Sequence, residues 1–401
     1  MSKAIFLNFP THGCINSLLA TAKELVDRGE KIIYYCTEEF EDKIKQTGAE
    51  FRPYKGLINT FKIENFDLFK ALKLNLEMTI DKIEHNFETI QNENPDYIIH
   101  DSLCTWGKQI ASLLKIPAVN LMHSFPITQS SITFNYGTAT LLLKIGFYKI
   151  FGPLKKNYPP RILKQRYDVD ISLGDILINK EALNIVYTSK YMEPEIYQKS
   201  KSYQFVGPSL FFKDEQSDFP FEKLKDKKVV YISLATLLSN NPAFFKKCID
   251  AFRNKKYNVV LSIGFELDIK AFDDLPGNFI VRQTVPQQKL LEYVDVFITH
   301  AGMNSVNEAI CFGVPMILIP HTIEQKMIAK RITDMGLGKM MNINTFSQEE
   351  LNINAHELLS DPAYKNKALA YKSLFNDEEK RSHIEAADSI LDFIKKQGQM
   401  S

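Results

Sequence analysis

Short apolar runs alternate with longer segments of helical periodicity along the first half of the chain. Runs that are apolar at nearly every position are typical of strands buried on both faces. Their alternation with helices predicts an α/β fold with a parallel sheet covered on both sides. The predicted strands are KAIFLNFP (3–10), KIIYYC (31–36), DYIIHD (96–101), PAVNLMH (117–123), NIVYTS (184–189) and YQFVGPSL (203–210). The predicted helices occupy 17–29, 38–48, 66–93 and 102–115.

Two other segments of this half lack the alternation. Residues 124–180 mix aromatic, proline and basic positions, and we expect helices and loops of the kind that line binding pockets. The polar stretch 211–227, FFKDEQSDFPFEKLKDK, is broken by Pro220 and has the composition of an interdomain linker.

A second alternating series follows this stretch. It predicts two doubly wound halves, with a ligand at the carboxyl ends of their strands facing a shared cleft. The predicted strands are 228–235, 258–264, 278–283, 294–300 and 314–320, with helices over 243–254, from 303, and from 323 to the end.

Length and charge narrow the class of protein. At 401 residues the chain exceeds the size of a single core, so two domains are expected. Its 49 Lys and Arg balance 48 Asp and Glu. The chain therefore has no overall positive electrostatic field that would attract nucleic acid or anionic membranes. The N-terminal stretch reaches Pro10 too early for a signal peptide, and no later apolar run is long enough to span a membrane.

The cysteines point to a reducing compartment. They are odd in number and widely spaced, and none forms a CxxC pair, so neither a disulfide framework nor a zinc site is expected. We therefore expect a cytoplasmic protein. The five are Cys14, Cys36, Cys104, Cys248 and Cys311.

Some local patterns imitate well-known sites. Gly336-Leu337-Gly338 begins like a dinucleotide fingerprint but ends a helical segment instead of following a strand. Asp168-Val169-Asp170 resembles a metal-binding acid pair, yet no strand is predicted there to orient both carboxylates. The chain has no P-loop and no GxSxG elbow.

The most informative segment is 299–325, THAGMNSVNEAICFGVPMILIPHTIEQ. Gly302 permits a tight exit from a strand, and the amides of 303–305 then open a helix. A helix N-terminus binds phosphate without a metal. His300, Asn304 and Ser305 add side-chain donors, and Glu308 can accept from ribose hydroxyls. Alternatively, Asn304 and Ser305 cap the helix while Glu308 improves its dipole energy.

This segment resembles the donor-binding signature of family 1 glycosyltransferases, especially the bacterial macrolide glycosyltransferase branch, with its pattern like THGGMNS…EA…GVP…P…EQ. The resemblance covers nearly all of the chain and includes CTEEF (36–40), FVGPS (205–209), YISLAT (231–236) and VPQ (285–287). It implies the GT-B fold, with two Rossmann-like doubly wound domains facing a cleft. The implied organisation is an acceptor-binding domain over 1–212, a linker over 213–227, a nucleotide-sugar domain over 228–378, and a C-terminal helix over 379–401 that packs back on the first domain.

The resemblance also implies roles for single residues of the donor site. His300, Gly302, Asn304 and Ser305 would hold the diphosphate, and Glu308 would hold the ribose. The remaining positions are Val285 and Gln287 at the base, Glu324 and Gln325 at the sugar hydroxyls, and Ser233 and Thr236 at the opposite lip, where Ala235 replaces the usual Gly.

The catalytic position departs from the family pattern. Relatives carry Gly-His after the first strand, with the His acting as general base and an Asp orienting it. Here the motif is PTHGCIN, so that Cys14 occupies the His position and His12 stands two residues earlier, while Asp101 matches the orienting acid. An unperturbed thiol is mostly protonated at neutral pH, unlike imidazole. His12 could take the role, the acceptor could be acidic enough to need little help, catalysis could be weak, or His12 could be an ordinary surface residue.

The resulting hypothesis is an inverting, metal-independent transferase. It would move a hexose, with glucose preferred, from a UDP-sugar to a hydroxyl of a small, largely apolar natural product of macrolide, polyketide or phenolic type. The UDP-sugar is a co-substrate and no cofactor is expected. We expect no nucleic-acid partner, no stable membrane anchoring, and a monomer or weak homodimer. The alternatives are a UDP-sugar epimerase of the same fold and a catalytically weak binding protein.

Overall fold

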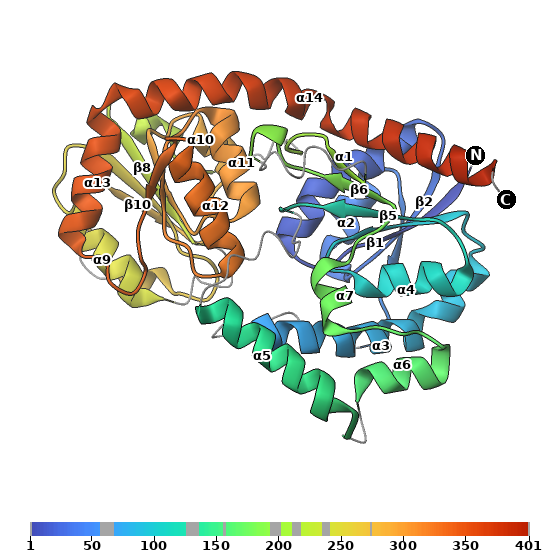
Figure 1. The fold of residues 1–401 in the computed structure, drawn as a ribbon. Coiled ribbons are helices and arrows are strands. Elements are labelled where there is room, and N and C mark those ends of the chain that lie inside the picture. The colour runs from blue at the N-terminus through green and yellow to red at the C-terminus, as the bar shows by residue number, and fades with distance from the viewer. Residues whose placement is uncertain are drawn as a thin grey trace. The chain divides into compact units, whose positions relative to one another are not determined.

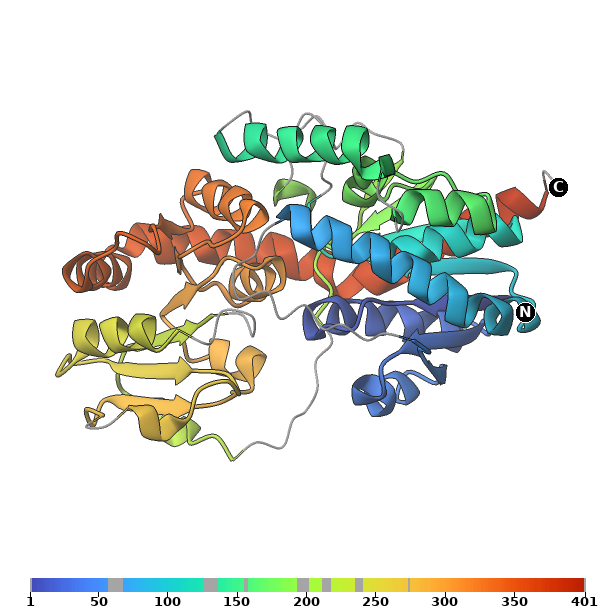
Figure 2. The same ribbon diagram turned by 90° about the horizontal axis from the view of Figure 1, so that it is seen from below.

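The computed structural model describes residues 2–56, 68–125, 136–154, 158–192, 202–210, 218–234, 241–272 and 275–399. The chain divides into two compact units, the first formed by 1–211 with 379–401 and the second by 212–378. Figures 1 and 2 show that each unit has a sheet with helices packed against it. All strand pairings among the described residues are parallel, as the sequence predicted.

The sheet of the first unit has seven strands in the order β3-β2-β1-β4-β5-β6-β7. They are β1 Lys3–Leu7, β2 Lys31–Cys36, β3 Glu50–Pro53, β4 Tyr97–Asp101, β5 Ala118–Met122, β6 Leu183–Val186 and β7 Tyr203–Phe205. Six of these strands lie where the apolar runs predicted them. The sequence analysis missed β3, a short edge strand without a fully buried residue.

Helices cover both faces of this sheet. They are α1 His12–Asp27, α2 Glu41–Lys45, α3 Leu68–Asn92, α4 Thr105–Leu114, α5 Tyr136–Phe151, α6 Pro159–Tyr167, α7 Leu173–Ile178 and the end of α14 Pro362–Gly398. Successive residues of β1 alternate between the faces: Ile5 and Leu7 pack with α3, α4, α6 and α7, whereas Ala4 and Phe6 pack with α1, α2 and α14. Figure 1 shows these two helical layers.

Helix α1 begins five residues earlier than its apolar periodicity predicted. Thr11 caps the helix by accepting a hydrogen bond from the amide of Cys14 at 3.5 Å. Gly13 and Cys14 therefore lie in the first helical turn. They do not form a flexible loop that could move His12 into the position of Cys14.

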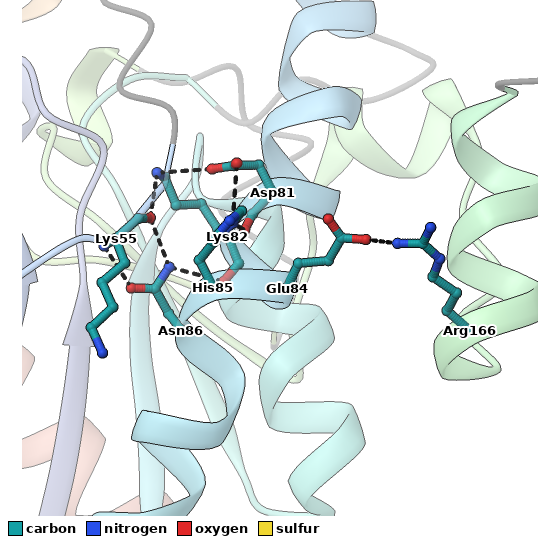
Figure 3. A network of polar contacts seen from close by, with 7 residues as sticks. All are labelled: Lys55, Asp81, Lys82, Glu84, His85, Asn86 and Arg166. Atoms are coloured by element: carbon teal, nitrogen blue, oxygen red, sulfur yellow. Dashed lines mark hydrogen bonds and ion pairs between the residues drawn. The ribbon is translucent and has the colours of Figure 1, made fainter.

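A buried lysine fixes the chain where it leaves β3 (Figure 3). The ammonium of Lys82 on α3 donates to the carbonyl of Lys55 at 3.1 Å and pairs with Asp81 at 3.2 Å. Burial lowers the pKa of Lys82, and the Asp81 carboxylate opposes that shift. Asn86 accepts from the Lys55 amide at 2.9 Å, so residues 54–56 are held on α3.

The sheet of the second unit has six strands in the order β10-β9-β8-β11-β12-β13. They are β8 Val229–Ser233, β9 Asn258–Ser262, β10 Phe279–Arg282, β11 Val296–Thr299, β12 Met316–Leu318 and β13 Gly338–Met340. The helices are α9 Pro242–Phe252, α10 Gln287–Leu291, α11 Met303–Phe312, α12 Ile323–Asp334, α13 Gln348–Ser360 and the start of α14.

Part of the predicted linker belongs to this second fold. Phe219 and Leu224 are buried, and the ring of Phe221 packs on that of Tyr293 at a centroid distance of 5.2 Å. The aromatic FPF sequence thus packs against the unit, although its charged neighbours suggested a linker. Residues 211–217 lie outside the described part of the chain.

The Gly336-Leu337-Gly338 pattern has a structural explanation. Gly336 follows α12 with φ +70, and Gly338 opens β13, the strand that the sequence analysis missed. A Cβ atom on Gly338 would lie 2.0 Å from the carbonyl oxygen of Met316, its partner on β12. Only glycine therefore permits the β12–β13 pairing.

We predict that Gly338→Ala destabilises the second unit by about 2 kcal/mol or more, because a methyl group there must displace a strand backbone. Urea unfolding measures this loss. Gly277→Ala is the matched control, since a Cβ at Gly277 has no neighbour within 4 Å. Equal stability of the two variants would contradict this account of the edge pairing.

Candidate active site

The residues predicted to bind phosphate gather at the carboxyl end of β11 in the second unit. Ser233 ends β8 and pairs in register with Thr299 at the end of β11, directly before His300. A Cβ on Gly302 would lie only 2.3 Å from Nε2 of His300. The imidazole therefore lies against the backbone of residue 302, where no side chain fits.

The start of α11 bears on the interpretation of Asn304 and Ser305 as helix caps. The N-cap is Gly302, and no side chain caps the helix. Asn304 and Ser305 are the second and third residues of the helix, so they do not act as its caps. Ala301, held at φ 65, turns the chain from strand to helix. The first turn of α11 thus has the open amide arrangement that binds anions.

His300 is a neutral polar group at this helix end. Burial, together with the nearby His321, lowers the pKa of His300 to about 4. Its Nδ1 is buried and has no hydrogen-bond partner among the described residues. A backbone hydrogen bond with Ser233 opposes that pKa shift without reversing it, so at neutral pH the ring carries no positive charge of its own.

Gln287 and Glu308, predicted to hold the base and the ribose, contact each other. Nε2 of Gln287 donates to Glu308 at 2.5 Å and to Oγ of Ser305 at 3.5 Å, while its Oε1 accepts from the Tyr231 hydroxyl at 2.8 Å. Gln288 donates to the other oxygen of Glu308 at 3.1 Å. Burial raises the pKa of Glu308, and the two amide donors oppose that shift. This network fixes the carboxylate one turn beyond the amides of 303–305.

Gln325 has a structural role that the sequence analysis did not assign. Thr322 caps α12 and accepts from the Gln325 amide at 3.2 Å, while Oε1 of Gln325 accepts from the amides of Thr322 and His321 at 3.2 and 2.8 Å. The Thr-x-x-Gln spacing in the sequence is the signal for this capping box. Glu324 is exposed beside it. Of the remaining predicted residues, Val285 is half-buried just before α10, and Thr236 lies outside the described residues.

In the first unit, Asp101 is a fully buried carboxylate at the end of β4. It accepts hydrogen bonds from the amides of Phe9 and Leu103 and, at 3.2 Å, from that of Cys104. Burial raises the pKa of Asp101, whereas the neighbouring His123 and these amides lower it. The ends of β1 and β4 are thereby tied together.

His123 is the functional candidate that the sequence analysis missed. It follows β5, which lies beside β4 in the sheet, and its Nε2 lies 3.6 Å from Sγ of the buried Cys14. The position next to the strand PAVNLM was the available signal, since carboxyl ends of parallel strands share one edge. Cys14, His123 and Asp101 therefore form one cluster.

His12 occupies a different position from this cluster. Its Nε2 pairs with Oε1 of Glu39 at 3.1 Å, its side chain is 54% exposed, and its ring packs edge-on against Phe40. Among the described residues the partners of Asp101 do not include His12. The structure thus places Cys14, and not His12, beside His123, because His12 projects from the first helical turn toward the segment after β2.

No group of three or more His, Cys, Asp or Glu side chains within the described ranges could hold a metal ion. Asp168 of the apparent acid pair is 89% exposed and pairs with Lys164 at 2.7 Å. The same part of the chain contains no helix that is long and apolar enough to cross a membrane.

Comparison with known proteins identifies the family. The family described as "UDP-glucoronosyl and UDP-glucosyl transferase" matches residues 221–387. The chain is 31% identical to the uncharacterized UDP-glucosyltransferase YojK of Bacillus subtilis (strain 168), covering 100% of this chain and 99% of the relative. It is also 31% identical to the NDP-glycosyltransferase YjiC of the same organism, with 97% of each chain covered.

A solved structure supports the same assignment. The calicheamicin glycosyltransferase CalG4 superposes with a TM-score of 0.78 and 25% identity, over 98% of each chain. The chain therefore belongs to the UDP-glycosyltransferases, as a family 1 enzyme of the macrolide type with the GT-B fold, and it transfers a sugar from a nucleotide donor to an acceptor.

The buried His300 predicts a pH-dependent loss of stability. Its folded pKa of about 4 lies below the unfolded value of 6.5, so the unfolded chain binds the extra proton between these values. Stability falls as pH decreases through this window, with a contribution from His300 of about 3 kcal/mol. In urea unfolding across this pH range, the free energy of unfolding of His300→Asn should decline less steeply than that of the wild type. Parallel profiles for the variant and the wild type would contradict the assignment.

Two substitutions of Gln325 separate capping from sugar binding. Gln325→Glu keeps an oxygen for the amides of Thr322 and His321 but removes the NH₂ group. We therefore expect unchanged stability and a loss of affinity, relative to the wild type, that is larger for UDP-sugar than for UDP. Gln325→Ala should in addition lose about 1 kcal/mol of stability. Thermal unfolding and calorimetry measure both effects. Equal losses of UDP and UDP-sugar affinity in Gln325→Glu would exclude a contact with the sugar.

Proposed function

We propose that the enzyme transfers a hexose, with glucose preferred, from a UDP-sugar to a hydroxyl of a small, largely apolar natural product, with inversion at the anomeric carbon and without a metal or cofactor. The observation that carries the proposal is the set of neutral donors at the start of α11. The uncapped helix begins beside His300, whose Nδ1 is buried without a partner. In this proposal a bound diphosphate is the hydrogen-bond partner of both the helix amides and the His300 ring.

The second unit binds the donor in this proposal. The amides of 303–305 and the imidazole of His300 receive the diphosphate, and the helix dipole stabilises the negative charge that develops on the leaving group. Glu308, fixed by Gln287 and Gln288, accepts from the ribose hydroxyls. Val285 and Gln287 flank the base in this proposal. Ser233 and Thr236 border the phosphates. Glu324 and the NH₂ group of Gln325 contact the sugar.

The first unit activates the acceptor. His123 is the proton acceptor: Nε2 takes the proton of the acceptor hydroxyl as the oxygen bonds to the anomeric carbon and the bond to the diphosphate oxygen breaks. Nε2 faces Sγ of Cys14 at 3.6 Å, so the acceptor hydroxyl replaces the thiol as the partner of this nitrogen. Asp101 stabilises the imidazolium, as its electrostatic interaction with His123 indicates.

The type of acceptor rests on the relatives. The calicheamicin glycosyltransferase, whose fold this chain shares over nearly its whole length, is named for calicheamicin. This likeness favours a natural product as acceptor, and the apolar lining typical of small-molecule sites favours an apolar one.

Incubation with UDP-glucose and a panel of phenols and macrolides in EDTA, followed by mass spectrometry, tests the proposal. The expected products are UDP and a β-linked glucoside in equal amounts, because inversion converts the α-linked donor. Free glucose or an isomerised sugar formed without acceptor would indicate an epimerase or hydrolase. Activity that requires added magnesium or manganese would contradict the metal-independent site.

Paired histidine variants test the acceptor side. His123→Asn should lower turnover on alcohol acceptors by about 10²–10⁴-fold, the usual range for general-base assistance, with a much smaller change in KM. His12→Ala is the control and should reduce turnover only slightly, since His12 pairs with Glu39. The rate of His123→Asn on phenols should follow the ionised fraction of the phenol. A large loss in His12→Ala with an unchanged His123→Asn would reverse the assignment.

A further inference from the structure

Helix α5 of the first unit turns an apolar stripe outward. Leu143, Phe147, Ile150 and Leu154 recur at helical spacing through α5 and the turn after it, and they are 74%, 63%, 68% and 81% exposed. Phe151 flanks the stripe, with its ring 4.3 Å from that of Phe147. Exposed apolar surface that is contiguous in this way marks an interaction site.

The opposite side of α5 is the one that packs on the protein. Tyr148 is buried, and its ring contacts those of Phe69 on α3 and Tyr158 at 5.7 and 5.3 Å. In both views α5 lies at the periphery of the first unit (Figures 1 and 2). The helix is therefore attached along one side, and the stripe is a separate surface.

The charge around the stripe has one sign. Residues 136–167 contain seven Lys or Arg and no Asp or Glu, although the whole chain is balanced at 49 to 48. Lys144 and Lys149 are exposed on α5, and the guanidinium of Arg161 donates to the carbonyl of Pro153, next to Leu154. Lys164 and Arg166 are paired with Asp168 and Glu84. Among the described residues, Lys144 and Lys149 thus lie on α5 itself, and Arg161 contacts the turn that follows it.

These properties favour one kind of partner for the apolar stripe. With 16 residues, α5 is too short to span a bilayer. A symmetric contact with a second copy would bring the cationic residues of both copies together without acidic partners. An anionic lipid surface instead offers an apolar layer for the stripe and phosphate groups for the lysines.

We propose that α5 docks the enzyme reversibly on anionic phospholipid bilayers, with the apolar stripe inserted at the boundary between headgroups and acyl chains. This inference does not depend on the proposed reaction. It differs from the expectation drawn from net charge, because the balanced total conceals a cationic segment. Docking would place the enzyme where apolar acceptors partition.

Flotation of the full chain with vesicles tests the docking surface. The wild type should bind vesicles of phosphatidylglycerol and phosphatidylcholine but not of phosphatidylcholine alone, and salt should weaken the binding. Phe147→Ser with Ile150→Ser, and separately Lys144→Glu with Lys149→Glu, should each reduce binding by at least about tenfold. Ile353→Ser on α13, an exposed apolar residue of the second unit, is the matched control and should bind like the wild type.

Several results would overturn the proposal. These are absence of wild-type binding to anionic vesicles, equal binding to neutral ones, and unchanged binding of either double variant. A wild-type dimer in solution that dissociates in the Phe147→Ser, Ile150→Ser variant would assign the stripe to an interface between copies instead. Thermal unfolding that matches the wild type in both units shows that the variants remain folded.

Discussion

The buried carboxylate of Asp101 is the interaction on which the acceptor side of the molecule depends. It accepts from the amides of Phe9, Leu103 and Cys104, so it joins the end of β1 to the end of β4. Burial of a charged group is costly unless donors surround it, and the amides of Phe9 and Leu103 together with His123 offset part of that cost, although the pKa of Asp101 remains raised. The same contacts fix where α1 begins. Cys14 is thereby held next to His123.

The donor side follows a different electrostatic principle. Its groups are dipoles and neutral side chains: the first turn of α11, the deprotonated ring of His300, and the amides that hold Glu308. In the proposed mechanism such a site recognises a diphosphate through these dipoles and neutral donors. Ala301 at φ 65 indicates that backbone strain is tolerated at this turn, where its conformation aims the amides.

Sequence patterns predicted those features that depend on neighbouring residues. Apolar runs placed most strands, and the contiguous segment 299–325 predicted the strand–turn–helix that forms the candidate donor site. The patterns missed β3 and β13, because they are short edge strands with polar or glycine residues. They also missed His123, whose contact with Cys14 joins residues 109 positions apart. Net charge concealed the cationic segment around α5, since a total contains no information on distribution.

The central claim is that the first turn of α11 binds the diphosphate without a metal. Its most direct measurement is the amide NMR spectrum of Met303, Asn304 and Ser305 during titration with UDP in EDTA. The account predicts downfield proton shifts of these amides that saturate with UDP and do not occur with uridine, because hydrogen bonds form to the phosphates alone. Binding of UDP that leaves these three signals unchanged, or that occurs only after a divalent cation is added, would contradict it.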